Sequence, residues 1–278
     1  GGFLIGTAHA REKSHTPLNL SDLLPGLNSS SAEARRSARS ALSKLAIANP
    51  TIIEGMLISD NSSRLELIAA IIALRDADVG SETLSQESVT RLIEFALAQN
   101  FSLRIQALIY LRTHPSDNVT KILEKIIADQ MIENDLPRSR ISRLGLEVFY
   151  NYADSFRQKF QNSRDTNDLD KALKYYEKAW DQRFEATEDE MVFYAKAQYG
   201  SGLINWFASF TPTGALNKYD FVEERASQSR SAFKTFLEFV ETHKAKRRYL
   251  HDHHLRQAKS CLDNFSPKCV KEFPPPTD

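Results

Sequence analysis

The sequence predicts an all-α protein, an α-solenoid in which antiparallel helical hairpins stack in succession. Ten glycines and ten prolines are few for a chain of 278 residues. Few helix breakers combined with Ala-, Leu-, Lys- and Glu-rich stretches favour long helices. Alternating β-branched strands and the Asn-Gly or Asp-Gly turns of hairpins are missing from the sequence. We therefore expect no β-sheet at the centre of the molecule.

The charges balance, with 36 basic and 36 acidic residues and a formal net charge of zero. A neutral chain has no global field that would attract nucleic acid or an anionic surface. We therefore expect a protein or peptide partner and no nucleic acid.

Residues 1–31 are expected to form an irregular arm, because Pro17, Pro25 and Gly26 interrupt a polar stretch. Its first six residues, GGFLIG, are apolar but far shorter than the roughly 20 residues that span a bilayer. Ala8-His9-Ala10 fits the small-x-small pattern of a signal-peptidase site. Two explanations stay open: a membrane or signal segment upstream of Gly1, which would allow membrane association, or a flexible arm.

Residues 32–132 are predicted to hold the first set of hairpins. Alanine and leucine four residues apart recur within apolar stripes at 41 and 45, 70 and 74, and 107 and 111. Each stripe is followed by a break and a second amphipathic segment, over 52–58, 89–98 and 119–128. This arrangement of helix, turn and helix resembles HEAT repeats.

A polar connector over 133–140, with Pro137 inside it, is the expected boundary before a second set of helices over 141–265. Within it, Ala172, Tyr176 and Ala179 lie at i, i+4 and i+7 of one helix. The two small residues let a neighbouring helix approach, and the ring fills the gap. The upstream helix is expected to end near Asn162, and Asp168 is the expected N-cap of the next one.

This second part resembles tetratricopeptide repeats, in the long form common in bacterial and fungal signalling arrays. Tyr152-Ala153 correspond to the leucine-glycine pair of that form and Lys159-Phe160 to its arginine-phenylalanine pair. The run from Asp168 to Ala172 matches the opening of its second helix, while Arg164 stands where the turn usually has glycine. The resemblance implies hairpins that stack into a binding surface, often beside caspase-like proteases or signalling NTPases.

Further helices are expected over 191–210, 221–242 and 246–263, with a loop over 210–220 and a proline-rich tail over 266–278. The resemblance places Tyr194, Gln198 and Asn205 on the groove-facing side of the first of these helices. Trp206 belongs to a dense apolar patch that either packs in the core or, where exposed, docks a partner.

The strongest local charge feature is the basic run that contains Lys244, Arg247 and Arg248. It either binds acidic peptide, phosphate or anionic lipid, or is a solvated helix start facing the acidic stretch 185–190. We expect replacement of these three residues by glutamate to weaken partner capture without unfolding the protein.

The only cluster of ligand-type residues extends from His251 to Cys269, and includes His253, His254 and Cys261. It is either a metal site or a solvated histidine surface. Cys261 and Cys269 would close a small loop in an oxidising compartment and remain thiols in a reducing one. Six Asn-x-Ser/Thr triplets do not settle the compartment; they begin at Asn19, Asn28, Asn61, Asn100, Asn118 and Asn264.

Signatures of enzymes such as a Gly-rich phosphate loop, HExxH, G-x-S-x-G or CxxC are missing from the sequence. We therefore expect no catalytic residues, cofactor or metal. The expected function is a non-enzymatic interaction scaffold or adaptor that binds along the inner face of the solenoid, as a regulatory or sensor arm of a signalling assembly. The alternatives are a membrane-tethered or exported structural component, and a metal-dependent module near His251–Cys269. A cytoplasmic location is favoured over a membrane-anchored or extracytoplasmic one.

Overall fold

The structure, a computed structural model, describes residues 18–129, 138–185, 191–215, 218–243 and 252–270. Within these ranges it contains twelve α-helices, two 3-10 turns and one two-stranded sheet. The predicted all-α fold is confirmed.

The first part of the chain forms seven α-helices and one 3-10 turn. They are α1 (Leu20–Leu27), α2 (Ala32–Ala48), α3 (Pro50–Ile58), α4 (Arg64–Asp76), η1 (Ser81–Thr83), α5 (Gln86–Leu97), α6 (Phe101–Thr113) and α7 (Asp117–Asp129). The second part begins with the longest helix. Its elements are α8 (Arg138–Ser163), α9 (Thr166–Asp181), η2 (Gln182–Glu185), α10 (Met191–Ala208), β1 (Phe210–Pro212), β2 (Tyr219–Phe221), α11 (Glu223–Thr242) and α12 (Asp252–Asp263).

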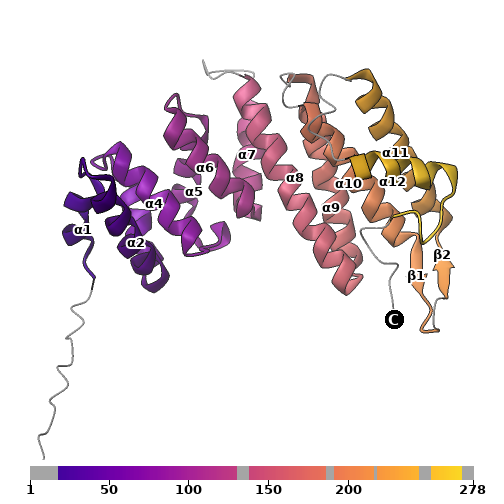
Figure 1. Ribbon diagram of the computed structural model, residues 1–278, viewed down its shortest axis with the longest axis horizontal. Helices are drawn as coiled ribbons and strands as arrows, with labels where there is room; N and C mark the ends of the chain where they lie inside the picture. The colour runs from indigo at the N-terminus through magenta and orange to yellow at the C-terminus, as the bar shows by residue number, and fades with distance from the viewer. Residues whose placement is uncertain (1–17, 130–137, 186–190, 216–217, 244–251, 271–278) are drawn as a thin grey trace, which may run out of the picture.

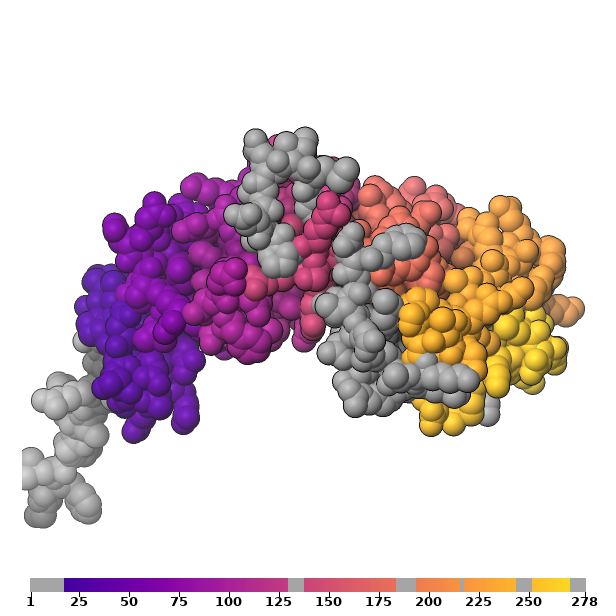
Figure 2. Space-filling view, turned by 90° about the horizontal axis from the view of Figure 1, so that it is seen from above, coloured from indigo at the N-terminus to yellow at the C-terminus, as the bar shows by residue number. Residues whose placement is uncertain are grey.

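The helices pack in neighbouring pairs that follow one another along the molecule (Figure 1). One layer consists of α2, α4, α6, α8 and α10, each of which contacts the next. The other layer begins with α3, α5 and α7, and in the second part α9 and α11 pack against α8 and α10. Figure 2 shows that the described helices form an arch whose two ends bend toward the same side.

Helix α1 corrects the prediction of an irregular arm over 1–31. Asn19 caps it, since its side-chain oxygen accepts a hydrogen bond from the Ser21 amide at 3.2 Å. Four leucines at positions 20, 23, 24 and 27 share one face, and the helix packs against α2. We expected Pro25 and Gly26 to interrupt the chain, but both lie inside this helix.

Polar caps fix where several helices of the first part begin. Ser63 and Glu66 form a reciprocal capping box at the start of α4. At the start of α5, the Glu54 carboxylate of α3 accepts hydrogen bonds from the Ser85 amide at 2.8 Å and from the Ser88 hydroxyl at 2.6 Å. Partial burial alone would raise the pKa of Glu54, but these hydrogen bonds lower the pKa below its ordinary value. A carboxylate thus joins two consecutive hairpins.

The turn between α8 and α9 is tighter than expected, and it moves the N-cap of α9. Arg164 adopts φ +59°, in the left-handed region where glycine is usual, and its amide donates to the Phe160 carbonyl at 2.8 Å. The chain reverses there, so Asp165 caps α9 by accepting from the Asn167 amide at 2.9 Å. The predicted cap, Asp168, lies in the first turn of the helix.

The predicted row of small and large residues on α9 packs as expected. Ala172, Tyr176 and Ala179 are all buried. A Cβ atom added to Gly200 of α10 would lie only 2.4 Å from Cζ of Tyr176. The glycine therefore provides the space into which the tyrosine ring fits.

A short hairpin replaces part of the loop expected over 210–220. Strands β1 and β2 pair antiparallel, with Phe210 opposite Phe221, and Gly214 takes φ +78° in the connection between them. We missed the hairpin because its strands have three residues each, too few for a periodic pattern.

Helix α8 joins the two parts of the arch, since it contacts α6 and α7 on one side and α9 and α10 on the other. Its Glu147 is 2% exposed and is paired with two arginines. Arg112 of α6 approaches its carboxylate at 3.3 Å and Arg143 of α8 at 3.0 Å. A buried carboxylate is tolerated when such pairing replaces its hydration.

Several predicted features lie outside the described residues. They are GGFLIG at 1–6, Ala8-His9-Ala10, most of the connector 133–140, the acidic stretch 186–190, the basic run 244–248, His251, and the tail from 271. Of the helices that the structure describes, none alone has the length and apolarity to cross a membrane. The bent pair α2–α3, whose axes differ by 116°, passes that test only when both helices are taken together.

Candidate partner-binding surface

Tyr194 and Asn205, which we expected on the groove-facing side of α10, are in the core, and so is Trp206, for which both a core and a docking position were open. Tyr194 and Trp206 are 0% exposed and Asn205 is 3% exposed. The Tyr194 hydroxyl donates to the Gln182 carbonyl at 2.7 Å, and the Asn205 amide donates to the Ser201 carbonyl at 3.0 Å. The structure therefore does not offer these three side chains to a partner.

The C-terminal segment 252–270 covers α10 around Tyr199 and Trp206. Trp206 Nε1 donates to the Ser266 carbonyl at 2.9 Å, and the Tyr199 hydroxyl donates to Oε1 of Gln257 on α12 at 2.6 Å. Cys261 and Cys269 form a disulfide that closes the loop carrying Ser266. The apolar patch around Trp206 thus packs against the chain's own C-terminal residues.

The remaining predicted contact residues have different positions. Gln198 is half-buried on α10. Lys244, Arg247 and Arg248 lie outside the described residues. The prediction that the basic run binds a partner stays a prediction.

The candidate metal site loses its sulfur ligands. Both cysteines are bonded to each other, so neither offers a thiolate. The rings of His253 and His254 contact each other at a tilt of 59°, with centroids 4.2 Å apart, and His254 also contacts the Tyr199 ring. In the part of the chain that the structure describes, no three His, Cys, Asp or Glu side chains are placed to hold a metal ion.

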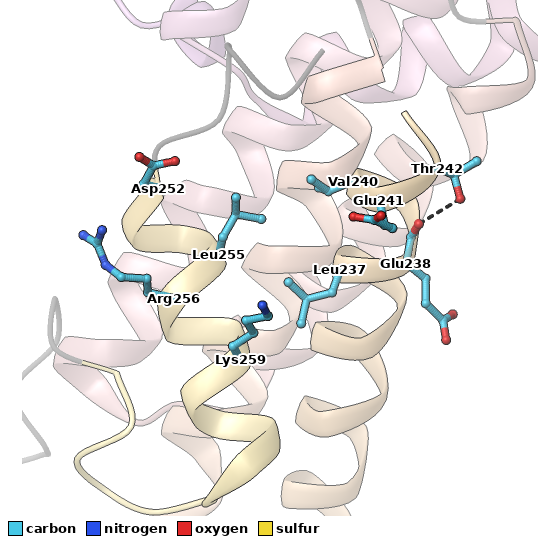
Figure 3. A pocket seen from close by; sticks show the side chains of 9 residues that line it. All are labelled: Leu237, Glu238, Val240, Glu241, Thr242, Asp252, Leu255, Arg256 and Lys259. Carbon is cyan, nitrogen blue, oxygen red and sulfur yellow. Dashed lines mark hydrogen bonds between the residues drawn. The ribbon is translucent and has the colours of Figure 1, made fainter. Parts of the chain in front are cut away.

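A first hollow, of about 650 Å³, lies between α11 and α12 (Figure 3). Leu237 and Leu255 point into the space between the two helices. Its rim has charges of both signs, contributed by Glu238, Glu241, Asp252, Arg256 and Lys259. This mixed rim does not favour a ligand of either charge.

A second hollow, of about 680 Å³, is lined by α8 and by two loops, one before η1 and one that joins α6 to α7. Two of the three acidic residues in its described lining, Asp78 and Asp117, have internal partners. Asp78 pairs with Nε2 of His114 at 3.0 Å, and Asp117 accepts from the Tyr152 hydroxyl at 2.7 Å. Burial, followed by that hydrogen bond, raises the pKa of Tyr152. These contacts hold loops together at the junction of the two parts.

A third hollow, of about 420 Å³, is the groove between α6 and α8. Its described lining includes three arginines and no carboxylate; the residues are Ala96, Phe101, Arg104, Ile105, Leu108, Ser139, Arg140, Arg143 and Leu144. Phe101 is 65% exposed at its edge, and the Arg104 guanidinium lies 5.5 Å from the centre of that ring. The groove combines positive charge with an apolar floor.

Two of these arginines converge on the end of α5. Arg104 Nη1 donates to the carbonyls of Ala98 at 3.1 Å and Gln99 at 3.2 Å. Arg140 Nη1 reaches the same Ala98 carbonyl at 3.5 Å and that of Leu97 at 3.3 Å. Its Nη2 donates to the Gln99 side chain at 3.1 Å. Two like charges therefore share neutral acceptors at a helix C-terminus.

Our sequence reasoning missed this groove. The run Arg138-Ser-Arg140-Ile-Ser-Arg143 was a signal, but we had assigned its first part to a connector. Arg104 is some 40 positions away in sequence, and only the packing of α6 against α8 brings it to that run. The zero net charge of the chain also hides such local separation of charge.

Comparisons of this chain with protein-family models, with curated proteins and with solved structures found no match.

Proposed function

We propose that this chain is a non-enzymatic scaffold or adaptor that binds a peptide or protein surface, as a regulatory or sensor arm of a larger signalling assembly. The proposal is carried by the succession of neighbouring helix pairs in an arch with a concave side (Figure 2). Helices that are packed on both sides are ordered before a partner arrives, so little conformational entropy is lost on the scaffold side.

We further propose that α2–α7 are HEAT-like hairpins and that α8–α12 are tetratricopeptide-like hairpins. The packing of Tyr176 against Gly200 supports the second assignment, because a small residue facing a ring permits close hairpin packing. Arg164 differs from that repeat type, since it adopts a left-handed conformation with a large side chain.

Selection from a peptide library displayed on phage tests the proposal. The immobilised protein is compared with an unrelated helical protein of near-zero net charge. We expect related peptides to be enriched on this chain alone and to protect its backbone amides from hydrogen exchange on one side of the arch. Failure to enrich any peptide above the control would contradict a scaffold function.

The disulfide favours a second candidate, an exported or membrane-tethered structural component. Cys261 and Cys269 are the two cysteines of the sequence, and they are bonded to each other. Disulfides persist in oxidising compartments and are rare in the cytosol. Asn19, Asn28 and Asn264, each the first residue of a glycosylation triplet, are exposed.

Thiol alkylation before lysis separates the two locations. Cells that express the chain are treated with an alkylating reagent, and the mass of the protein is measured with and without reduction. Protection of both cysteines until reduction supports an oxidising compartment, whereas alkylation of both before reduction supports the cytoplasm.

A further inference from the structure

The groove between α6 and α8 has the charge and the apolar surface to recognise one class of ligand. We propose that it binds a partner segment in which carboxylate side chains adjoin an apolar side chain. The inference rests on the proposed scaffold function, and it adds the site and the chemistry of the partner.

The first argument is the positive charge of Arg104 and Arg140, which pair with no carboxylate in the described part of the chain. Arg104 and Arg140 both donate to the Ala98 carbonyl, at 3.1 and 3.5 Å, so their guanidinium groups are close neighbours. Their recorded acceptors are backbone carbonyls and one amide oxygen, all neutral. Like charges held this close repel each other, and a bound anion would remove that repulsion.

The nearest buried carboxylate does not supply that anion. Glu147 is already shared by Arg112 and Arg143, at 3.3 and 3.0 Å, so its carboxylate is engaged away from Arg104 and Arg140. Asp and Glu are not found among the described residues of its lining.

The arginines retain donors that a carboxylate can use. A guanidinium has five N–H groups in a planar fork. Both recorded bonds of Arg104 begin at Nη1, so within the described part of the chain the N–H groups of its Nη2 have no acceptor. Carboxylates match this fork with two parallel hydrogen bonds.

The second argument is the apolar part of the groove. Leu108 and Leu144 are buried below it, Ile105 is half-buried, and Phe101 is 65% exposed at its edge. An exposed aromatic ring next to a hollow is a frequent anchor for a partner's apolar side chain. A small inorganic anion would leave this surface unused, which is why we favour a peptide segment.

Nucleic acid fits the groove less well. A duplex or single strand contacts many phosphates along an extended basic surface, usually with several stacking rings. Here three arginines line a hollow of about 420 Å³ with a single aromatic ring, on a chain of zero formal charge.

Fluorescence anisotropy with a labelled synthetic peptide tests the proposal. The probe alternates Glu and Asp with Leu and Phe, and the control peptide replaces each acid by its amide. We expect the acidic probe to bind about tenfold to a hundredfold more tightly than the amide control, as the loss of a charge-assisted contact would give. Its affinity should fall as the salt concentration rises.

Two variants test whether the probe binds in the groove, and a third is their control. Arg104→Gln with Arg140→Gln should weaken binding by about tenfold to a hundredfold. Ser139→Glu, which removes none of the arginine contacts, should weaken binding because it supplies a competing carboxylate. Arg36→Gln, a matched change of an exposed arginine on α2, should leave the affinity unchanged. Circular dichroism and urea midpoints establish that each variant is folded.

Four outcomes would overturn the inference. One is equal affinity for the acidic and amide peptides, and another is unchanged binding by both folded groove variants. Displacement of the probe by inorganic phosphate at equal concentration would indicate a simple anion site, and tighter binding of a single-stranded oligonucleotide would indicate a nucleic-acid surface. If library-selected peptides still bind these variants, the groove is not the binding site but the scaffold function stands. If no peptide binds the protein at all, the groove proposal and the scaffold proposal are both wrong.

Discussion

Arg164 allows a quantitative test of how the second part of the arch is held together. Its left-handed backbone costs roughly 1–2 kcal/mol relative to glycine, and its side chain offsets that cost. The guanidinium lies 3.6 Å from the centre of the Phe207 ring and donates to the carbonyls of Phe207 at 3.0 Å and Phe210 at 3.1 Å. Burial lowers the pKa of Arg164 to about 10, so the group remains charged at neutral pH.

Replacement of Arg164 by glycine removes both the strain and the contacts. Two hydrogen bonds from a charged donor contribute roughly 1.5 kcal/mol each, and the contact with the ring adds about 1 kcal/mol. Nη2 is buried without a hydrogen-bond partner in the described structure, which argues against larger values. After the relief of strain, we expect Arg164→Gly to lower the free energy of unfolding by about 2–3 kcal/mol.

Urea unfolding followed by far-UV circular dichroism measures this change, and Arg164→Ala is the matched control. Alanine loses the same contacts but keeps most of the strain, so we expect it to be about 1 kcal/mol less stable than the glycine variant. In a protein of this size the glycine variant should melt roughly 3–5 °C below the parent. A glycine variant as stable as the parent, or more stable, would refute the idea that the side chain compensates for the turn.

Three further predictions concern packing, covalent cross-linking and pH. Gly200→Ala should lower the free energy of unfolding by about 1–3 kcal/mol because of overpacking. Gly55 has open space around it, so Gly55→Ala should raise the free energy of unfolding by about 0.5–1 kcal/mol. Equal changes in the melting temperatures of the two variants would show that close packing at Gly200 is irrelevant. Replacing Cys261 and Cys269 by serine should cost about 2–3 kcal/mol, measured by urea unfolding with and without reductant, and a reductant-insensitive parent would contradict this value. The pKa of Glu54 is lowered in the folded state. Its ionised carboxylate therefore adds to the free energy of unfolding above the unfolded-state pKa, and this stabilisation is lost as pH falls through the folded-state pKa. Glu54→Gln should therefore make the free energy of unfolding depend less on pH below about pH 5. If the variant and the parent lose stability equally between pH 5 and lower pH, Glu54 does not stabilise the fold in this way.

The fold was largely predictable from periodicity, since the helices from α2 onward follow apolar stripes at helical spacing. Helix α1 was missed although its four leucines have that spacing, because we gave more weight to Pro25 than to the pattern. The cap of α9 was misplaced because an arginine rarely adopts a left-handed conformation, so we did not expect a tight turn at Arg164 although the resembling repeat usually has glycine there.

The candidate surface was less predictable, because it depends on which distant segments meet. Trp206 is buried by a segment about 60 positions later in the chain, through its bond to the Ser266 carbonyl. Arg104 and Arg140 become neighbours only when α6 packs on α8. The periodicity of apolar residues identifies which face of a helix is buried. It does not identify the element that covers that face, because this element can come from a distant part of the sequence.

Helix α8 has a mechanical consequence for how the arch engages partners. At about 1.5 Å per residue, its 26 residues form a continuous rod roughly 40 Å long that takes part in both halves. A hinge between the halves would have to bend this rod and break its backbone hydrogen bonds. If the proposed scaffold function holds, a bivalent partner that contacts both halves would meet them at a preset separation and would gain avidity without the cost of arranging the scaffold.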